Sequence, residues 1–201
     1  MSTRSYAWLD TDVDFHNSLN KNIMLTLRIR LVTTIAITLI MAAFMLWKHT
    51  HGGVVSHHIF GDENMPSISN WWGLLTIPLA TWISLTLIQK RHNATTSEET
   101  MTRSEIYRFL GGLTLGITIT ILFYHAPDYT SPVLLATFVI ALFLPIYRPA
   151  FYLGFTLSMI YGFGGVIPAV FGLFLTAIFA IEYLLIRKAF LFLINKANAR
   201  K

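Results

Sequence analysis

The sequence predicts an all-α integral membrane protein, a polytopic bundle of about six transmembrane helices with both termini in the cytoplasm. Three observations lead to this fold class. First, 54% of the 201 residues are hydrophobic and 12% are charged, which is about half the charged fraction of a soluble domain. Second, the apolar residues gather in six tracts that are separated by short polar segments. The tracts use nearly the whole length, so we expect one transmembrane domain, 1–201.

The third observation is the distribution of the basic residues over the polar segments. If the tracts cross the membrane in turn, alternate segments share a side, and 14 of the 15 Lys and Arg fall on one side. Lys48 falls on the other. Cytoplasmic loops are enriched in Lys and Arg, so this asymmetry places both termini inside. The pattern is typical of a multi-pass protein of the bacterial inner (cytoplasmic) membrane.

The six tracts, in order along the chain, are residues 25–47, 71–89, 106–124, 132–146, 150–163 and 166–186. The N-terminal segment, the outer loop rich in His and Asp, the main cytoplasmic loop and the basic tail are residues 1–23, 48–70, 90–104 and 187–201. Within the second tract, Pro78 predicts a kink, because proline removes a helical hydrogen bond. Thr102 and Glu105 have the spacing of a capping box, which predicts that the third helix begins there.

Two glycine patterns predict how the later helices meet. Gly112 and Gly116 are four residues apart, a spacing that lets a second helix approach closely. Three glycines within 162–165 predict a break between the fifth and sixth tracts, since glycine destabilises helix interiors. Two arrangements of residues 149–186 stay open: two spans, or one span and a re-entrant element. The second would move five basic residues outside, against the charge asymmetry.

Titratable side chains gather on the side predicted to lie outside. The outer loop contains four histidines and two carboxylates, and the next outer loop contains one of each. Imidazole and carboxylate groups bind zinc, iron or copper, and they act as general acids and bases near neutral pH. The candidate catalytic residues are His57, His58, Asp62, Glu63, His125 and Asp128. The candidate metal ligands are His51, His57, His58, His125 and Asp128.

The spacing of these residues matches no metal signature, and the chain contains no HExxH motif. The cofactor is therefore unassigned, with a divalent metal such as zinc as one expectation. Two other interpretations stay open: solvated residues at the membrane interface, and a group of histidines that senses pH. Trp71 and Trp72 stand at the start of the second tract, as expected for aromatic rings at headgroup level. In the functional interpretation they border the entrance to the outer site.

The leading hypothesis is a small membrane enzyme, such as a hydrolase, that uses the outer site on a lipid-like substrate. One alternative is a permease or channel for a small solute or ion, with Pro78 and the glycine-rich break as hinges. Another is a non-catalytic membrane subunit or assembly factor, with Gly112 and Gly116 and the pair Gly154 and Ser158 as helix contacts. The expected partners are the lipid bilayer and a lipid-like or small-solute ligand, and the oligomeric state stays open.

Composition also excludes some classes of function. The net charge of +5 is carried by residues beside the apolar tracts, where topology and anionic headgroups account for it, so we expect no nucleic-acid partner. The chain has no cysteine, which excludes disulfides, thiolate metal sites and a cysteine nucleophile.

Overall fold

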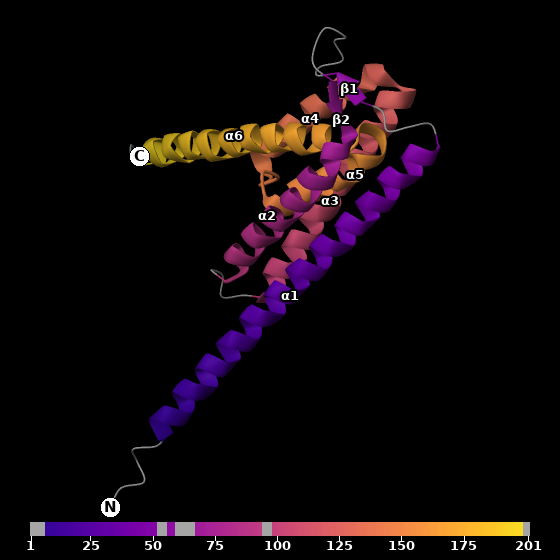
Figure 1. The fold of residues 1–201 in the computed structure, drawn as a ribbon. Helices are drawn as coiled ribbons and strands as arrows, with labels where there is room; N and C mark the ends of the chain where they lie inside the picture. Colours follow the sequence, from indigo (N-terminus) through magenta and orange to yellow (C-terminus); the bar gives the residue numbers. More distant parts are fainter. Residues whose placement is uncertain (1–6, 52–55, 59–66, 94–97, 199–201) are drawn as a thin grey trace, which may run out of the picture.

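The computed structural model describes residues 7–51, 56–58, 67–93 and 98–198, and the side chains of 27–51, 69–93, 103–186 and 188–189. This part of the chain is predominantly helical (Figure 1). Its α-helices are α1 (Ala7–Thr50), α2 (Gly73–Asn93), α3 (Glu98–His125), α4 (Thr130–Phe143), α5 (Pro149–Phe163) and α6 (Val166–Asn198). Two 3-10 turns, η2 (Asn70–Trp72) and η3 (Pro127–Tyr129), and an antiparallel hairpin of β1 (Ser56–His58) and β2 (Ser67–Ser69) complete it.

Four helical segments are long and apolar enough to cross a membrane, judged by length and composition: Leu27–Thr50, Asn70–Asn93, Arg103–His125 and Val166–Ile186. Between 11% and 28% of each such span is buried inside the protein, as expected when the solvent around a helix bundle is hydrocarbon. α4 has 14 residues and α5 has 15, whereas a transmembrane helix needs ~20. A total of six spans therefore stays a prediction.

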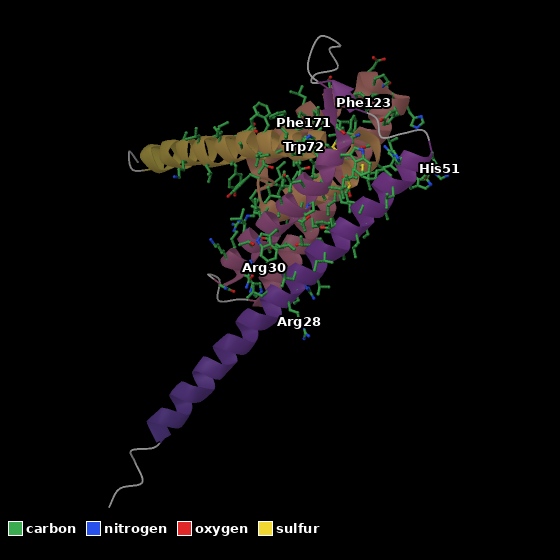
Figure 2. The ribbon with its side chains drawn as sticks, viewed as in Figure 1. Arg28, Arg30, His51, Trp72, Phe123 and Phe171 are labelled. Carbon is green, nitrogen blue, oxygen red and sulfur yellow. The ribbon has the colours of Figure 1, made fainter. Side chains whose placement is uncertain are left out.

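Arg30 and His51, both near the limits of the apolar part of α1, lie at opposite ends of the bundle (Figure 2). Figure 2 shows Arg28 and Arg30 at one end of the membrane-length part of α1 and His51 at the other. We call the first the basic end, defined by Arg30, Arg108 and Arg148, and the second the histidine end, defined by Lys48, His49 and His51.

At the basic end, side-chain contacts tie neighbouring helices together. Arg30 on α1 donates to Thr86 Oγ1 on α2 at 2.8 Å and lies over the Trp82 ring at 4.9 Å. Glu105 on α3 is buried and accepts from Arg108 Nη1 at 2.7 Å. Arg148, which precedes α5, lies 3.7 Å from the same carboxylate oxygen. A carboxylate shared by two guanidinium groups is a charge-assisted contact, so it fixes α5 against α3 at this end.

α3 and α5 pack backbone against backbone along a seam. A Cβ added at Gly112 would overlap the carbonyl oxygen of Phe151, and one added at Gly154 would overlap that of Phe109. Small residues let helices approach this closely and gain van der Waals contact. The close approach predicted from Gly112 is therefore confirmed.

The partner across this seam belongs to the same chain. A Cβ added at Gly116 would overlap Ser158 Oγ, so the small-residue faces of α3 and α5 are occupied by each other. The helix contacts predicted from these residues are therefore made within the chain.

The glycine-rich break between the fifth and sixth tracts is confirmed. α5 ends at Phe163, and the Gly164 N–H donates to the Ile160 carbonyl oxygen at 2.9 Å. Gly164 has φ +75° and ψ −165°, a region that is essentially restricted to glycine. α6 begins two residues later at Val166 and runs for 33 residues. Residues 149–186 thus belong to two helices joined by a tight turn.

One local prediction is corrected by the structure. α3 begins at Glu98, so Thr102 and Glu105 are no capping box. Glu105 instead pairs with Arg108 at i,i+3, a spacing that stabilises helix interiors. Within the predicted N-terminal segment 1–23, α1 begins at Ala7. Within the predicted outer loop 48–70, α1 ends at Thr50, and the two described strands of the hairpin follow.

Candidate functional site

The structure describes only part of the predicted outer site. His57 and His58 lie in β1, where their backbone partners are Ile68 and Ser67 of β2, and their side chains are outside the described residues, as are Asp62 and Glu63. Among the described residues, no group of three or more His, Cys, Asp or Glu side chains could hold a metal ion. The predicted metal site thus gains no support from the described residues and stays a prediction.

The His51 ring has a defined orientation at the end of α1. It stacks on the Trp47 ring with centroids 5.2 Å apart and planes at 25°. Its Nδ1 lies 3.0 Å from the Trp47 carbonyl oxygen and 2.9 Å from Thr50 Oγ1. A carbonyl oxygen can only accept, so the tautomer with the hydrogen on Nδ1 satisfies this contact and has Nε2 as the acceptor of the ring. His51 is therefore a histidine whose ring is held in a defined orientation.

The other described candidates near the histidine end are exposed. His49 meets the Trp71 ring edge-on, with centroids 6.0 Å apart, and Trp71 and Trp72 are exposed in η2, just before α2. Their exposure fits the predicted entrance at headgroup level. His125, the last residue of α3, and Asp128, in η3, are both exposed.

A groove between α1 and α5 was not predicted from the sequence. Its volume is about 330 Å³, and its lining residues are Ile37, Ile40, Met41, Phe44, Leu157, Ser158, Ile160 and Tyr161. The lining is almost wholly apolar, and the Ser158 hydroxyl already donates to the Phe155 carbonyl oxygen at 2.9 Å. The volume falls at the lower end of the ~300–1,000 Å³ that is usual for ligand pockets.

A lysine is held where the groove ends toward the histidine end. The Phe44 and Tyr161 rings, from α1 and α5, lie 5.9 Å apart. Lys48 Nζ lies 5.0 Å from the centre of the Phe44 ring and 5.9 Å from that of Tyr161. It also donates to the Tyr161 carbonyl oxygen at 3.3 Å. Cation–π contacts and this hydrogen bond hold the ammonium group close to the groove.

An aromatic ladder on α1 connects the groove to His51. The Phe44 ring, which lines the groove, stacks on Trp47 with centroids 6.3 Å apart and planes at 21°, and Trp47 stacks on His51. The spacing i, i+3, i+7 places the three rings on one helix face. That part of the site could have been predicted from the sequence, whereas the Tyr161 side of the groove depends on how α5 packs.

Several hydroxyl groups within the bundle bond to their own helices. Thr38, Thr114 and Thr120 donate to the carbonyl oxygens four residues earlier, at 2.7–2.8 Å. Such back-bonding satisfies the hydroxyl locally, so these three side chains give no support to a polar path through the bundle.

No family model matches this chain, and neither a curated protein nor a solved structure is similar to it. The groove and the histidine end are the features of the described residues that bear on function.

Proposed function

We propose that this chain is an integral membrane protein that binds a lipid-like molecule at its outer face. The hydrocarbon chain of the ligand lies in the groove between α1 and α5, and its headgroup lies beside Lys48 and His51. The observation that supports this proposal best is the groove, an apolar hollow with an ammonium group held close to one end. The histidine end then faces the outside of a bacterial inner membrane, in line with the charge asymmetry.

The dimensions of the groove suit one leaflet of a bilayer. On α1 it extends from Ile37 to Phe44, which is about 10 Å of helix at 1.5 Å per residue. The hydrocarbon core of a bilayer is ~30 Å thick, so the groove covers most of one leaflet. Lys48 is one helical turn beyond Phe44, and Lys and Trp side chains prefer headgroup level. A ligand that fits is apolar along the groove and polar beside Lys48.

His51 supplies the chemistry of the enzyme hypothesis. Its free Nε2 can accept a proton from a water molecule or a headgroup hydroxyl. The other candidates in the two outer loops would complete an acid–base or metal site above the headgroup. Hydrolysis of an ester bond in the headgroup is the reaction that we expect from such a site.

The first experiment fills the groove and measures the lipid that co-purifies with the protein. Ile40 lines the groove and is 69% exposed, so Ile40→Trp adds an indole where space exists. Leu39, the preceding residue, is 64% exposed and is not a lining residue, so Leu39→Trp is the matched control. We expect mass spectrometry to show about one lipid fewer per protein in Ile40→Trp than in Leu39→Trp or in the unchanged chain.

Both variants must elute as single species in size-exclusion chromatography, with unchanged helical content. Equal amounts of bound lipid in the unchanged chain and in the two variants would refute the groove as a ligand site.

A further inference from the structure

We propose that the headgroup is anionic, and that the ligand is a phospholipid of net negative charge whose phosphate binds the Lys48 ammonium group. This inference rests on the proposed function and assigns the chemical class of the ligand. It names a partner for a charged side chain that the fold places beside an apolar groove.

The Lys48 ammonium group has unused donors and a fixed position. It has three N–H donors, and the Tyr161 carbonyl oxygen accepts one of them. The two aromatic rings beneath it limit where the side chain can go. Because the group is held in advance, an anion that binds there does not have to order a flexible lysine.

No acid in the described part of the chain neutralises this lysine. The described carboxylates that form ion pairs do so at the basic end, where Glu105 pairs with Arg108 and Arg148. Around Lys48, the described partners are a carbonyl oxygen and two rings. A partly buried cation with neutral partners attracts an anion more strongly than a cation in bulk water does.

The position of Lys48 in the sequence also supports an anionic ligand. It is the one Lys or Arg that the predicted topology puts outside, against 14 inside, so the positive-inside tendency gives no reason for it. His51 lies three residues further on, a spacing that puts both side chains on neighbouring parts of the helix surface.

A net negative charge is expected because a zwitterionic lipid carries its own ammonium group, which competes for the phosphate. The contact between Lys48 and the phosphate is the same in both lipids, so the preference comes from the lipid's own ammonium group, which repels Lys48 and is partly screened by solvent. We therefore expect the groove to prefer an anionic over a zwitterionic phospholipid with the same acyl chains by about three- to tenfold, the order of one screened charge–charge interaction near a protein surface.

The test uses photocrosslinking in proteoliposomes made from the full chain. Trace phosphatidylglycerol or phosphatidylcholine, each with the same diazirine-bearing acyl chain, is added to unlabelled phosphatidylcholine. Crosslinks to the groove residues Leu157 and Ile160 are counted relative to those on the exposed residues Val170, Leu173 and Phe174 of α6. We expect a three- to tenfold excess of phosphatidylglycerol in the groove of the unchanged chain.

Two substitutions at one position isolate the charge. Lys48→Gln should bring the ratio of the two lipids in the groove to about one, and Lys48→Arg should keep the excess. An unchanged excess in Lys48→Gln, or no excess in the unchanged chain, would overturn the inference.

Ile40→Trp separates this inference from the proposed function. If the groove binds lipid chains, this variant loses groove crosslinks from both lipids equally. Loss of those crosslinks in Ile40→Trp, together with equal labelling by both lipids in the unchanged chain, would keep the groove and reject the anionic headgroup. If the unchanged chain shows no groove crosslinks from either lipid, both proposals fail.

Discussion

Among the helices around α5, α3 and α1 meet it in contrasting ways. Toward α3 it meets glycine, and the two backbones touch at Gly112 and Gly154. Toward α1 it meets Ile37, Met41 and Phe44, and a hollow of about 330 Å³ remains. Residue size accounts for the close seam, because small residues let helices approach each other. The side of α5 toward α3 is therefore closed, whereas the side toward α1 borders the groove.

The α3–α5 and α1–α5 contacts also differ in the polar interactions that hold the helices together. The α3–α5 seam is tied at three levels: Glu105 with Arg148 at the basic end, the glycines in the middle, and Tyr124 at the histidine end. Tyr124 Oη donates to the Gly162 carbonyl oxygen at 2.7 Å. Between α1 and α5, the described hydrogen bond is that of Lys48 with Tyr161. A ligand between α1 and α5 thus disturbs few fixed contacts.

The largest loss of stability is expected where the backbones of α3 and α5 are closest. In Gly112→Ala, the new methyl group would overlap the Phe151 carbonyl oxygen, and neither backbone can move without separating the helices. We expect a loss of at least about 3 kcal/mol of stability, at the upper end of overpacking costs, or no folded protein. The measurement is the thermal denaturation of detergent-solubilised protein.

Gly111→Ala is the matched control for this substitution. A Cβ at Gly111 would lie 3.8 Å from the nearest atoms of the Phe151 ring, an ordinary contact. Equal denaturation temperatures for the two variants would show that α3 and α5 are not in backbone contact.

The second largest loss of stability is expected at the basic end of the α3–α5 seam. Glu105→Gln leaves Arg108 and Arg148 without their shared carboxylate, and Glu105 is 7% exposed. Breaking a buried pair by removing one partner costs about 3–5 kcal/mol, and we expect about 2–4 kcal/mol because both arginines are partly exposed. Thermal denaturation should show the loss, and Asp128→Asn, at an exposed site, should show none. A Glu105→Gln protein as stable as Asp128→Asn would mean that the ion pairs contribute nothing to the seam.

The parts of the fold that depend on local pattern could be predicted from the sequence. Apolar tracts locate the four long helices, and the glycines at 162–165 locate the turn between α5 and α6, because each signal acts within a few residues. The prediction of a capping box at Thr102 and Glu105 was wrong. Glu105 lies inside α3 and pairs with Arg108, three residues later, so a glutamate that suits a capping box also suits an ion pair within a helix.

The groove could not be predicted, because it depends on the distance between two helices that are far apart in sequence: Lys48 and Tyr161, which meet at its end, are 113 residues apart. Nothing local to Tyr161 indicates that Lys48 lies beside it. The α1 half of the site was accessible, since Phe44, Trp47 and His51 share a helical face. His51, a predicted metal ligand, stacks on Trp47, which is four residues earlier in the chain, so its orientation depends on a local contact.

The smallest effect is expected at the histidine end of the seam, and it tests whether the two faces of α5 are independent. Tyr124→Phe removes the hydroxyl that donates to the Gly162 carbonyl oxygen and keeps the ring, which contacts Phe163. A single hydrogen bond contributes about 0.5–1.5 kcal/mol, so thermal denaturation should show a loss of about 1 kcal/mol. Because the groove is on the other face of α5, lipid bound to Tyr124→Phe should equal that of the unchanged chain. A loss of bound lipid would show that the seam holds Tyr161 in place and that the two faces of α5 act together.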